Sequence, residues 1–554
     1  LEAVKYISSP LLVLAGAGSG KTSVITQKIS YLINECGYPA HKIAAVTFTN
    51  KAAREMKERV SQLGRQNSEG KSARGLTIST FHHLGLTIIR REHAKLGFKS
   101  GFSIFDSQDS LGLLKSLLHK EGEISDEQLK SIQNSISSWK NQLLSPAQAE
   151  QVTQDAEEVF AARVYTEYQR HLSAFNAVDF DDLIRLPVTL FQEQPDVLER
   201  WQNRIHYLLV DEYQDTNSSQ YLLVKQLVGH RSNFTVVGDD DQSIYAWRGA
   251  RPENLAELQA DFPSLKVVKL EQNYRSTGII LKAANGVISN NSGRLGKNLW
   301  TDDKDGEPIA LYAAFNEMDE ARFIVSQIEQ WHKDGGLRAE CAILYRSNAQ
   351  SRVLEEALIR AQMPYRIYGG QRFYDRLEIR NALAYLRLIK NRNDDAALER
   401  VFNVPTRGVG AATVAKIRQN ARAEGCSMWD STKQILSQKV MPTRAHNAIE
   451  SFIGLIDRLD EDTSELSLHE MVDLVIQQSG LVQHHLKEKG EKAQTRIENL
   501  KELVSAAKEF ANSWNPVQDS DDPDGDLDPV ATTPLAAMLD QAALDAGEQQ
   551  ADES

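Results

Sequence analysis

The chain has 554 residues with a formal net charge of −13, and 41% of its residues are apolar and 25% charged. This composition is ordinary for a soluble globular protein, and the length predicts about three or four domains. Its three cysteines are too few and too scattered for a disulfide framework or a zinc site, and they indicate a reducing cytoplasm. No unbroken apolar stretch is long enough to span a bilayer, which excludes a membrane-embedded function.

The acidic balance does not exclude nucleic acid as a partner. A net charge averages over domains, whereas a binding track needs only a local groove with basic and aromatic groups. Much of the acid lies in one segment, "DSDDPDGDLDP", from Asp519 to Pro529. We interpret this segment as a solvated linker. Residues 515–554 as a whole, which are Asp- and Pro-rich and then Ala-rich, are expected to form a tail or linker.

Strands and helices alternate in residues 11–59 and again in residues 205–270. Buried strands are predicted at five apolar runs, namely "LLVLAG" (11–16), "KIAAVTFTN" (42–50), "YLLVDE" (207–212), "FTVVGDD" (234–240) and "LKVVKLEQ" (265–272). This alternation predicts a parallel, doubly wound sheet. A long helical, polar stretch from about Leu86 to Trp201 separates the two parts, and we interpret it as an insertion into the sheet domain.

A second αβ pattern begins after Arg275. Its candidate strands are "PIALYAA" (308–314), "ECAILYR" (340–346) and "MPYRIYGG" (363–370). From about Phe373 to Trp514 the pattern is again mostly helical. The chain therefore reads as a coarse duplication, in which two αβ cores are each followed by a helical insertion.

The first strand runs into a glycine-rich loop that fits the pattern [A/G]-x-x-x-x-G-K-[S/T]. Glycines allow backbone N–H groups to surround phosphate oxygens, and the following helix adds its positive N-terminal end. A lysine neutralises phosphate charge, and a hydroxyl next to it ligates Mg²⁺. The alternative is a plain glycine turn. The nucleotide-binding residues that this loop predicts are Ala15, Gly16, Ala17, Gly18, Ser19, Gly20, Lys21 and Thr22.

Two carboxylates end the strand of "YLLVDEYQDTN". In an enzyme that hydrolyses a nucleotide, Asp211 would hold Mg²⁺ through water, and Glu212 would act as the general base toward the attacking water. The alternative is a pair of solvated acids at a strand end.

The stretch "VVGDDDQSIYAWRGA" (236–250) follows another predicted strand. Gln242 is placed to sense a γ-phosphate, and Tyr245, Trp247 and Arg248 form a candidate stacking platform for unpaired bases. The alternative is an aromatic core cluster, but ligands bind at the carboxyl ends of strands in such sheets.

Three further stretches place aromatic and polar groups at predicted strand ends. "TFTNKAAREM" (47–56) and "STFHHLG" (79–85) offer hydroxyls and amides for phosphate contacts and a ring for stacking on a base. "LEQNYRST" (270–277) offers Arg275 to a phosphate and Tyr274 to a base. The alternative for the last is a structural arginine in a linker between domains.

Taken in order, these stretches resemble the motifs of superfamily 1 helicases of the UvrD/Rep group. "AGAGSGKT", "AVTFTNKAAREM", "STFHHLG", "LLVDEYQDTN", "VVGDDDQSIYAWRGA" and "LEQNYRS" are similar to motifs I, Ia, Ib, II, III and IV. Up to about Leu281 the sequence is more similar to the Rep members. From "NNSGRLGKNLWTDDKDGEP" onward it is more like the UvrD (helicase II) members.

The resemblance implies an α/β fold with two RecA-like P-loop domains, the second incomplete, each carrying a mainly helical insertion. It divides the chain into domain 1A (1–88 and 206–272), insertion 1B (89–205), domain 2A (273–372), insertion 2B (373–514) and the tail 515–554. It implies a 3′–5′ DNA helicase that uses ATP and Mg²⁺, works in repair or replication and binds single strands and duplex junctions in the nucleoid.

The resemblance also assigns roles to residues. Catalysis falls to Lys21, Asp211, Glu212, Gln242 and Arg275, and the metal to Thr22 and Asp211. Tyr274 packs on adenine. The DNA contacts that the family's motifs imply are Phe48, Asn50, His82, Tyr245, Trp247, Arg248 and, in the turn "PTRGVGAATV", Arg407, Gly408 and Gly410.

The chain also departs from the family pattern. Ser23 stands where the family commonly has an arginine, which weakens the contacts expected beside adenine. The family's adenine-reading glutamine and its motifs V and VI are not found, so we expect a fragment lacking both ends. Three alternatives to a DNA helicase stay open: an RNA-directed motor, a helicase–nuclease, and a module that binds nucleotide and DNA without efficient turnover.

Overall fold

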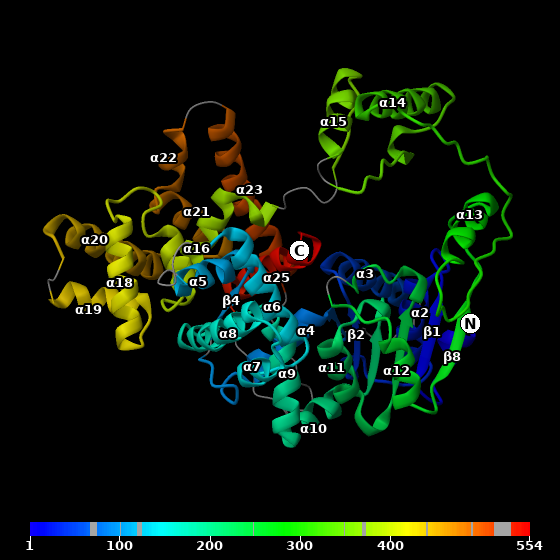
Figure 1. Cartoon of the computed structure of the whole chain (residues 1–554), viewed down its shortest axis with the longest axis horizontal. Helices are drawn as coiled ribbons and strands as arrows, with labels where there is room; N and C mark the ends of the chain where they lie inside the picture. Colours follow the sequence, from blue (N-terminus) through cyan, green and yellow to red (C-terminus); the bar gives the residue numbers. More distant parts are fainter. Residues whose placement is uncertain are drawn as a thin grey trace.

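The structure is a computed structural model that describes residues 1–66, 75–99, 101–118, 124–246, 249–347, 350–367, 373–438, 441–488, 491–514 and 533–553. Figure 1 shows a sheet domain near the N-terminus, a large helical body beside it, and an arm, residues 273–367, that arches from one to the other. Within the described ranges, no helix has both the length and the apolar character needed to cross a membrane.

The sheet domain is built on six parallel strands. Their spatial order is β3-β2-β6-β7-β1-β8. The strands are β1 (Leu11–Ala15), β2 (Ile43–Thr47), β3 (Thr77–Thr80), β6 (Tyr207–Val210), β7 (Phe234–Gly238) and β8 (Lys266–Leu270). β1 lies between β7 and β8, with Val13 opposite Val237 and Val268. The five strands predicted from the early apolar runs are therefore confirmed.

Helices cover both faces of this sheet, because the central strands are apolar on both sides. One face packs on α1 (Glu2–Lys5), α2 (Lys21–Asn34) and α3 (Asn50–Gln66). The other packs on α4 (Phe81–Arg91), α9 (Asp182–Glu193), α10 (Pro195–Arg204), α11 (Ser218–Val228) and α12 (Asn254–Asp261). The predicted doubly wound fold is confirmed.

The stretch between β3 and β6 is helical, as expected. Besides α4, α9 and α10 it contains α5 (Ser107–Leu118), α6 (Asp126–Asn141), α7 (Pro146–Val152) and α8 (Ala156–Ala174). We call α5 to α8 the first insertion. A two-stranded parallel sheet flanks this insertion, with β4 (Ser103–Phe105) before α5 and β5 (Ala177–Asp179) after α8. The sequence did not indicate these two strands.

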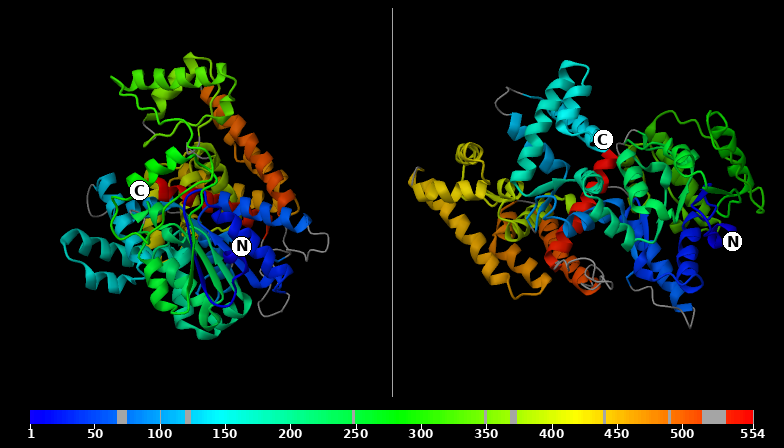
Figure 2. Two further views of the ribbon diagram at one scale, coloured as in Figure 1. Left: turned by 90° about the vertical axis from the view of Figure 1, so that its right-hand side faces the viewer. Right: turned by 90° about the horizontal axis from the view of Figure 1, so that it is seen from below.

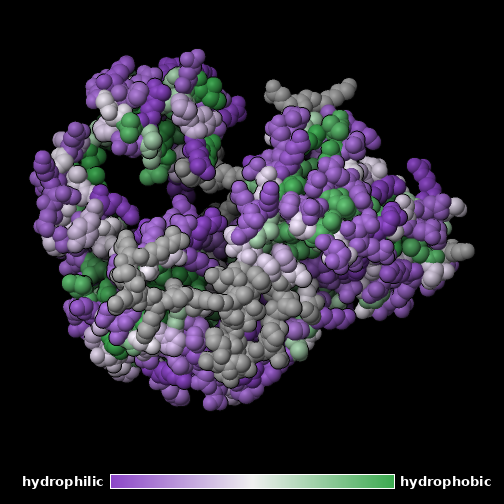
Figure 3. Space-filling view, turned by 180° about the vertical axis from the view of Figure 1, so that it is seen from behind, coloured by the Kyte–Doolittle hydropathy of each residue, from purple (hydrophilic) through white to green (hydrophobic). Residues whose placement is uncertain are grey.

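The second αβ pattern is the main correction to the sequence analysis. The arm consists of α13 (Gly278–Ile288), α14 (Glu317–Lys333) and α15 (Ser351–Arg360). No strand forms in the described residues of 273–367, so 308–314, 340–346 and 363–367 are not strands here. A strand needs a neighbour for its backbone groups, and without one Leu311 and Leu344 are 97% and 94% exposed. Figure 3 shows the arm separated from the rest by an opening.

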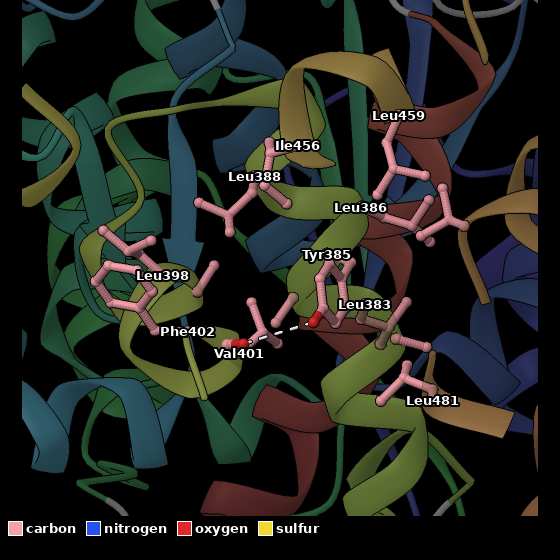
Figure 4. Close-up of a cluster of buried hydrophobic side chains, with 14 of the residues drawn as sticks. Leu383, Tyr385, Leu386, Leu388, Leu398, Val401, Phe402, Ile456, Leu459 and Leu481 are labelled. Atoms are coloured by element: carbon pink, nitrogen blue, oxygen red, sulfur yellow. Dashed lines mark hydrogen bonds between the residues drawn. The ribbon is translucent and has the colours of Figure 1, made fainter. Parts of the chain in front are cut away.

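The helical body gathers around one helix, α16 (Leu377–Lys390). Tyr385 on this helix is fully buried, and its hydroxyl donates to the carbonyl of Val404 at 2.6 Å. Figure 4 shows the leucines of α16 packed among side chains from α17, α20 and α22. The remaining helices of this body are α17 (Asp395–Val401), α18 (Ala411–Glu424), α19 (Met428–Gln438), α20 (Thr443–Thr463), α21 (Leu468–Gln478), α22 (Leu481–Leu486) and α23 (Glu491–Ser513).

The second half of the predicted tail or linker over 515–554 is a packed helix. Residues 534–553 form α25 (Pro534–Glu553), whereas 515–532 lie outside the described residues. Leu535 and Leu539 of α25 join the core around α16, and Leu544 joins a second core with Leu86 and Ile89 of α4. Figure 2 shows this red helix running through the middle of the molecule.

Buried ion pairs accompany these apolar contacts. Asp540 of α25 pairs with Arg90 of α4 and, at 3.5 Å, with Lys390 of α16. One turn earlier on α16, Arg387 lies 2.7 Å from Asp109 of the first insertion. A buried charge that loses its partner is strongly destabilising, so these pairs fix the way the helical body sits on the rest.

Because Leu544 is 3% exposed, Leu544→Ala removes packing that joins α25 to α4. We expect this change to lower the free energy of unfolding by about 2–5 kcal/mol, measured as a shift of the urea midpoint. The control is Leu486→Ala at a 57% exposed site, where a change of less than about 0.5 kcal/mol is expected. Equal shifts for the two variants would contradict the structural role of α25.

Candidate active site

The glycine-rich loop connects β1 to α2 through two backbone conformations that suit glycine. Gly18 and Gly20 have φ angles of +67° and +92°, which disfavour any residue with a side chain. Inside the loop, the hydroxyl of Ser19 donates to the carbonyl of Gly16 at 2.7 Å. The loop is thus held in a tight curve at the carboxyl end of β1.

The N-terminus of α2 is open to an anion. Its N-cap is Gly20, and no side chain caps the first turn, although α6 and α11 each have a capping box. The uncapped N–H groups and the positive end of the helix dipole favour a phosphate at this point. Lys21 and Thr22 occupy the first two helical positions, where they flank such a phosphate.

The two carboxylates at the end of β6 face this loop. Glu212 Oε2 accepts a hydrogen bond from Lys21 Nζ at 2.9 Å and another from Gln214 Nε2 at 2.9 Å. Glu212 itself has a φ angle of +50°, a conformation that costs free energy for a residue other than glycine. The surrounding hydrogen bonds hold this strained conformation beside the phosphate loop.

Asp211 lies deeper, with 4% of its surface exposed. Its Oδ1 accepts the backbone N–H of Glu212 at 3.0 Å. Burial, followed by the charge of Glu212, raises the pKa of Asp211 to about 6. A buried carboxylate of this kind is stabilised by a cation, and carboxylate oxygens are hard ligands that suit Mg²⁺.

The loop after β7 carries Gln242 and is linked to the same network. Gln214 Oε1 accepts the N–H of Asp239 at 2.9 Å, while its Nε2 binds Glu212. Gln242 Nε2 donates to Oδ2 of Asp239 at 2.5 Å. Lys21, Glu212 and Gln242 are therefore joined through two intermediate side chains.

The segment after β8 packs directly on the glycine-rich loop. The N–H of Gly16 donates to the carbonyl of Leu270 at 3.1 Å, and Asn273 Nδ2 donates to the carbonyl of Ala17 at 2.6 Å. The N–H of Tyr274 donates to the carbonyl of Gly18 at 3.0 Å. Tyr274 is 69% exposed, with its hydroxyl donating to Gln272 Oε1 at 2.9 Å, and Arg275 beside it is also exposed. Both side chains therefore lie at the surface beside the glycine-rich loop.

Three expected DNA contacts lie near the ends of β2 and β3. The ring of Phe48 meets Phe81 at 5.4 Å between centroids, and His82 stacks on Phe180 at 3.9 Å. Burial lowers the pKa of His82 to about 3, so its ring is neutral. Asn50 Nδ2 donates to Asp545 of α25. All three side chains thus have partners within the protein in this conformation.

The stacking platform predicted after β7 is only partly described. Tyr245 is half-buried, and Ile244 next to it is 69% exposed. Trp247 and Arg248 lie outside the described residues. Their predicted contact with bases stays a prediction.

The turn before α18 differs in part from the expectation. Gly408 and Gly410 are exposed, and Gly408 has a φ angle of +86°. The guanidinium of Arg407, however, is directed inward, where Nη2 donates to the carbonyl of Ser479 at 2.6 Å and the group lies over the ring of Tyr385. Arg407 therefore supports the turn in this conformation, and its predicted contact with DNA stays a prediction.

Sequence reasoning missed three residues that organise the site, namely Gln214, Asn273 and Lys297. Gln214 and Asn273 lie inside motif stretches, where their position at strand ends is a usable signal. Lys297 lies outside motifs I to IV, in the stretch "NNSGRLGKNLWTDDKDGEP", and it contacts the acidic run at 239–241 only through the fold.

Comparison with known sequences identifies the family. The profile of the UvrD/REP helicase N-terminal domain matches residues 1–263, and that of the UvrD-like helicase C-terminal domain matches residues 268–554. The chain belongs to the UvrD/Rep helicase family. The resemblance stated from the motifs is thereby confirmed.

Individual members of the UvrD/Rep family match nearly the whole chain. DNA helicase II of Escherichia coli (strain K12) is 48% identical over 553 residues, which cover 100% of this chain and 74% of the relative. ATP-dependent DNA helicase Rep of the same strain is 48% identical, covering 91% and 75%. ATP-dependent DNA helicase PcrA of Staphylococcus aureus (strain Mu50) is 44% identical, covering 92% and 69%.

The raised pKa of Asp211 makes cation binding dependent on pH. Mg²⁺ binds the ionised carboxylate, and Asp211 takes up its proton as the pH falls through about 6. We expect the affinity for Mg²⁺ in the presence of ADP to fall roughly fourfold between pH 7.5 and pH 5.5, measured by calorimetric titration. Asp211→Asn is the control and should bind Mg²⁺ weakly at both pH values. An equal pH effect in that variant would assign the effect to the nucleotide instead.

Proposed function

We propose that this chain is an ATP-dependent DNA helicase that moves 3′ to 5′ along a single strand and opens duplex DNA during repair or replication. The observation that carries the proposal is the network joining Lys21, Glu212 and Gln242 at the mouth of an uncapped helix. The names of the relatives support ATP and DNA as substrates. The direction of movement rests on the family resemblance.

Each side chain of the network has a defined task in hydrolysis. Lys21 and the N–H groups at the start of α2 bind the phosphates, and Thr22 and Asp211 hold Mg²⁺, which neutralises phosphate charge when it is bound. Glu212 accepts a proton from the attacking water. Gln242 and Arg275 contact the γ-phosphate, and Tyr274 stacks on the base.

The proposed domain boundaries follow from the family resemblance. We assign residues 1–88 and 206–272 to domain 1A, 89–205 to insertion 1B, 273–372 to domain 2A and 373–514 to insertion 2B. Closing of 2A on 1A would bring Arg275 onto the phosphate, and reopening would follow hydrolysis. The exposed side chains of Tyr274 and Arg275 support this closing movement.

Contacts with DNA complete the proposal. Phe48, Asn50, His82 and Tyr245 would line the track of the single strand, together with Trp247 and Arg248. Gly408 and Gly410 would meet the duplex backbone through their N–H groups. In the present conformation Asn50 binds Asp545, so DNA would have to compete with α25 for this side chain.

A second candidate is a module that binds nucleotide and DNA without efficient turnover. It is favoured by one observation: the described residues of 273–367 form no strand, and apolar side chains such as Leu311 stay exposed. An arginine placed on the γ-phosphate is worth about 10³–10⁵ in turnover, so an arm that fails to close would leave binding without hydrolysis.

The test is ATP hydrolysis by the 554-residue chain with and without single-stranded DNA. Stimulation by DNA supports the helicase, and DNA binding without stimulation supports the second candidate. We expect Glu212→Gln to lower the hydrolysis rate by about 10²–10⁴ through loss of the base, with ATP binding retained. Lys21→Ala should lose ATP binding as well. A Glu212→Gln variant that hydrolyses ATP at the normal rate would remove Glu212 from its role.

A further inference from the structure

A buried ammonium group lies among three carboxylates beside the nucleotide site. The side chain of Lys297 is 1% exposed, and its Nζ lies 2.9 Å from Asp239 Oδ1, 3.3 Å from Asp241 Oδ2 and in contact with Asp240. Burial acts to lower the pKa of Lys297, but its hydrogen bonds to Asp240 and Asp239 outweigh burial and raise it. The ammonium therefore stays charged and supplies the cation that these three carboxylates require.

Arg294 completes this cluster from the same segment. Its Nε and Nη2 each lie 2.7 Å from one oxygen of Asp241, and Nη2 also donates to the carbonyl of Lys297 at 2.8 Å. The N–H of Leu295 donates to Asp240 at 2.7 Å. The segment 294–297 thus binds the loop after β7 through ion pairs and through backbone hydrogen bonds.

Asp239 links Lys297 to Gln242, the side chain proposed to contact the γ-phosphate. Its Oδ1 accepts from Lys297, and its Oδ2 accepts the side-chain amide of Gln242 at 2.5 Å. Asp239 is 2% exposed and its N–H donates to Gln214. Because both oxygens are bonded, the Asp239 carboxylate is held in one orientation. Its hydrogen bond in turn fixes the side-chain amide of Gln242.

The other end of the segment meets the phosphate loop. A side chain added at Gly16 would lie 2.1 Å from Leu299, so Leu299 covers this glycine directly. The N–H of Trp300 donates to Glu271, and its carbonyl accepts from Asn273, which binds Ala17. One short segment, 294–300, therefore touches both the Gln242 loop and the phosphate loop.

We propose that Lys297 is a positioning residue that orients Gln242, through Asp239, toward the γ-phosphate of a bound nucleoside triphosphate. This inference rests on the proposed function, because it deepens the role given there to Gln242. Lys297 itself touches no phosphate. Its effect is therefore confined to ligands that carry a γ-phosphate, and a diphosphate should not detect its loss.

The experiment measures binding of two fluorescent analogues, N-methylanthraniloyl-AMPPNP and N-methylanthraniloyl-ADP, to the full chain with Mg²⁺. The readout is the ratio of the two dissociation constants, and neither needs turnover. We expect Lys297→Met to reduce the preference for the triphosphate by about tenfold, the loss of one hydrogen bond to a charged group. Affinity for the diphosphate should stay within about twofold of the unmodified chain.

A double-mutant cycle tests the route of the effect. If Lys297 acts through Gln242, Gln242→Ala alone should reproduce the loss, and adding Lys297→Met should lower the ratio no further. Lys297→Arg should keep most of the preference, since it restores the buried positive charge. Asp239→Asn, which is isosteric and removes the shared carboxylate charge, should behave as Lys297→Met does and serves if the methionine variant does not fold.

Lys269→Ala is the matched control. Lys269 Nζ holds the same segment by donating to the carbonyls of Leu295 and Gly296 at 2.8 Å, but it touches none of the three carboxylates. We expect this variant to keep the preference for the triphosphate. A loss equal to that of Lys297→Met would mean that Lys297 only anchors the segment.

The inference is overturned if Lys297→Met keeps the preference, if its effect multiplies with that of Gln242→Ala, or if the unmodified chain binds both analogues equally. Failure of the proposed function has a different signature, the absence of DNA-stimulated hydrolysis in the unmodified chain. The two failures are thus read from separate measurements.

Discussion

The parallel pairing of β1 between β7 and β8 determines where the active site lies. Leu14 is opposite Gly238, and Ala15 is opposite Leu270, so the chain leaves all three strands at the same height. The phosphate loop, the loop bearing Gln242 and the segment bearing Arg275 therefore emerge side by side. Had any of these strands been antiparallel, its loop would lie at the opposite edge, and no side chain could bridge the distance.

The ion pair between Lys21 and Glu212 places this carboxylate in competition with a phosphate for the lysine. The lysine that would neutralise phosphate is paired with the carboxylate that would act as base. A phosphate entering the loop would compete with Glu212 for Lys21, and Gln214 would remain as the partner that keeps Glu212 in its strained conformation. The proposed base would then be released from the lysine without losing its position.

Sequence alone predicts the sheet domain well, because its central strands are continuous apolar runs bounded by loops with distinctive chemistry. The closeness of Lys21 and Glu212 could be predicted, since the loop that ends at Lys21 and the pair Asp211 and Glu212 follow strands of the same parallel sheet inside recognisable patterns. Lys297 escaped because its carboxylate partners are more than fifty positions away in the chain, and nothing local marks a lysine that is to be buried.

The errors have physical reasons as well. Residues 308–314 have the composition of a strand, but composition states only that a segment can pair, not that a partner lies beside it. Residues 534–553 follow an acidic stretch and are rich in alanine, which favoured a tail or linker over a packed helix. The spacing of Leu535, Met538 and Leu539 is that of one apolar helix face, and this signal was outweighed by the neighbouring charges.

Helix α25 has a consequence for movement. It inserts Leu535 and Leu539 into the core around α16 and Leu544 into the core beside α4, and Asp540 between them pairs with charges from both sides. Rotation of the helical body against the sheet domain has to break all of these contacts together, because they lie on one rigid rod. Helix α25 therefore opposes rotation of the helical body against the sheet domain, because any change of angle loses the packing and the ion pairs at once.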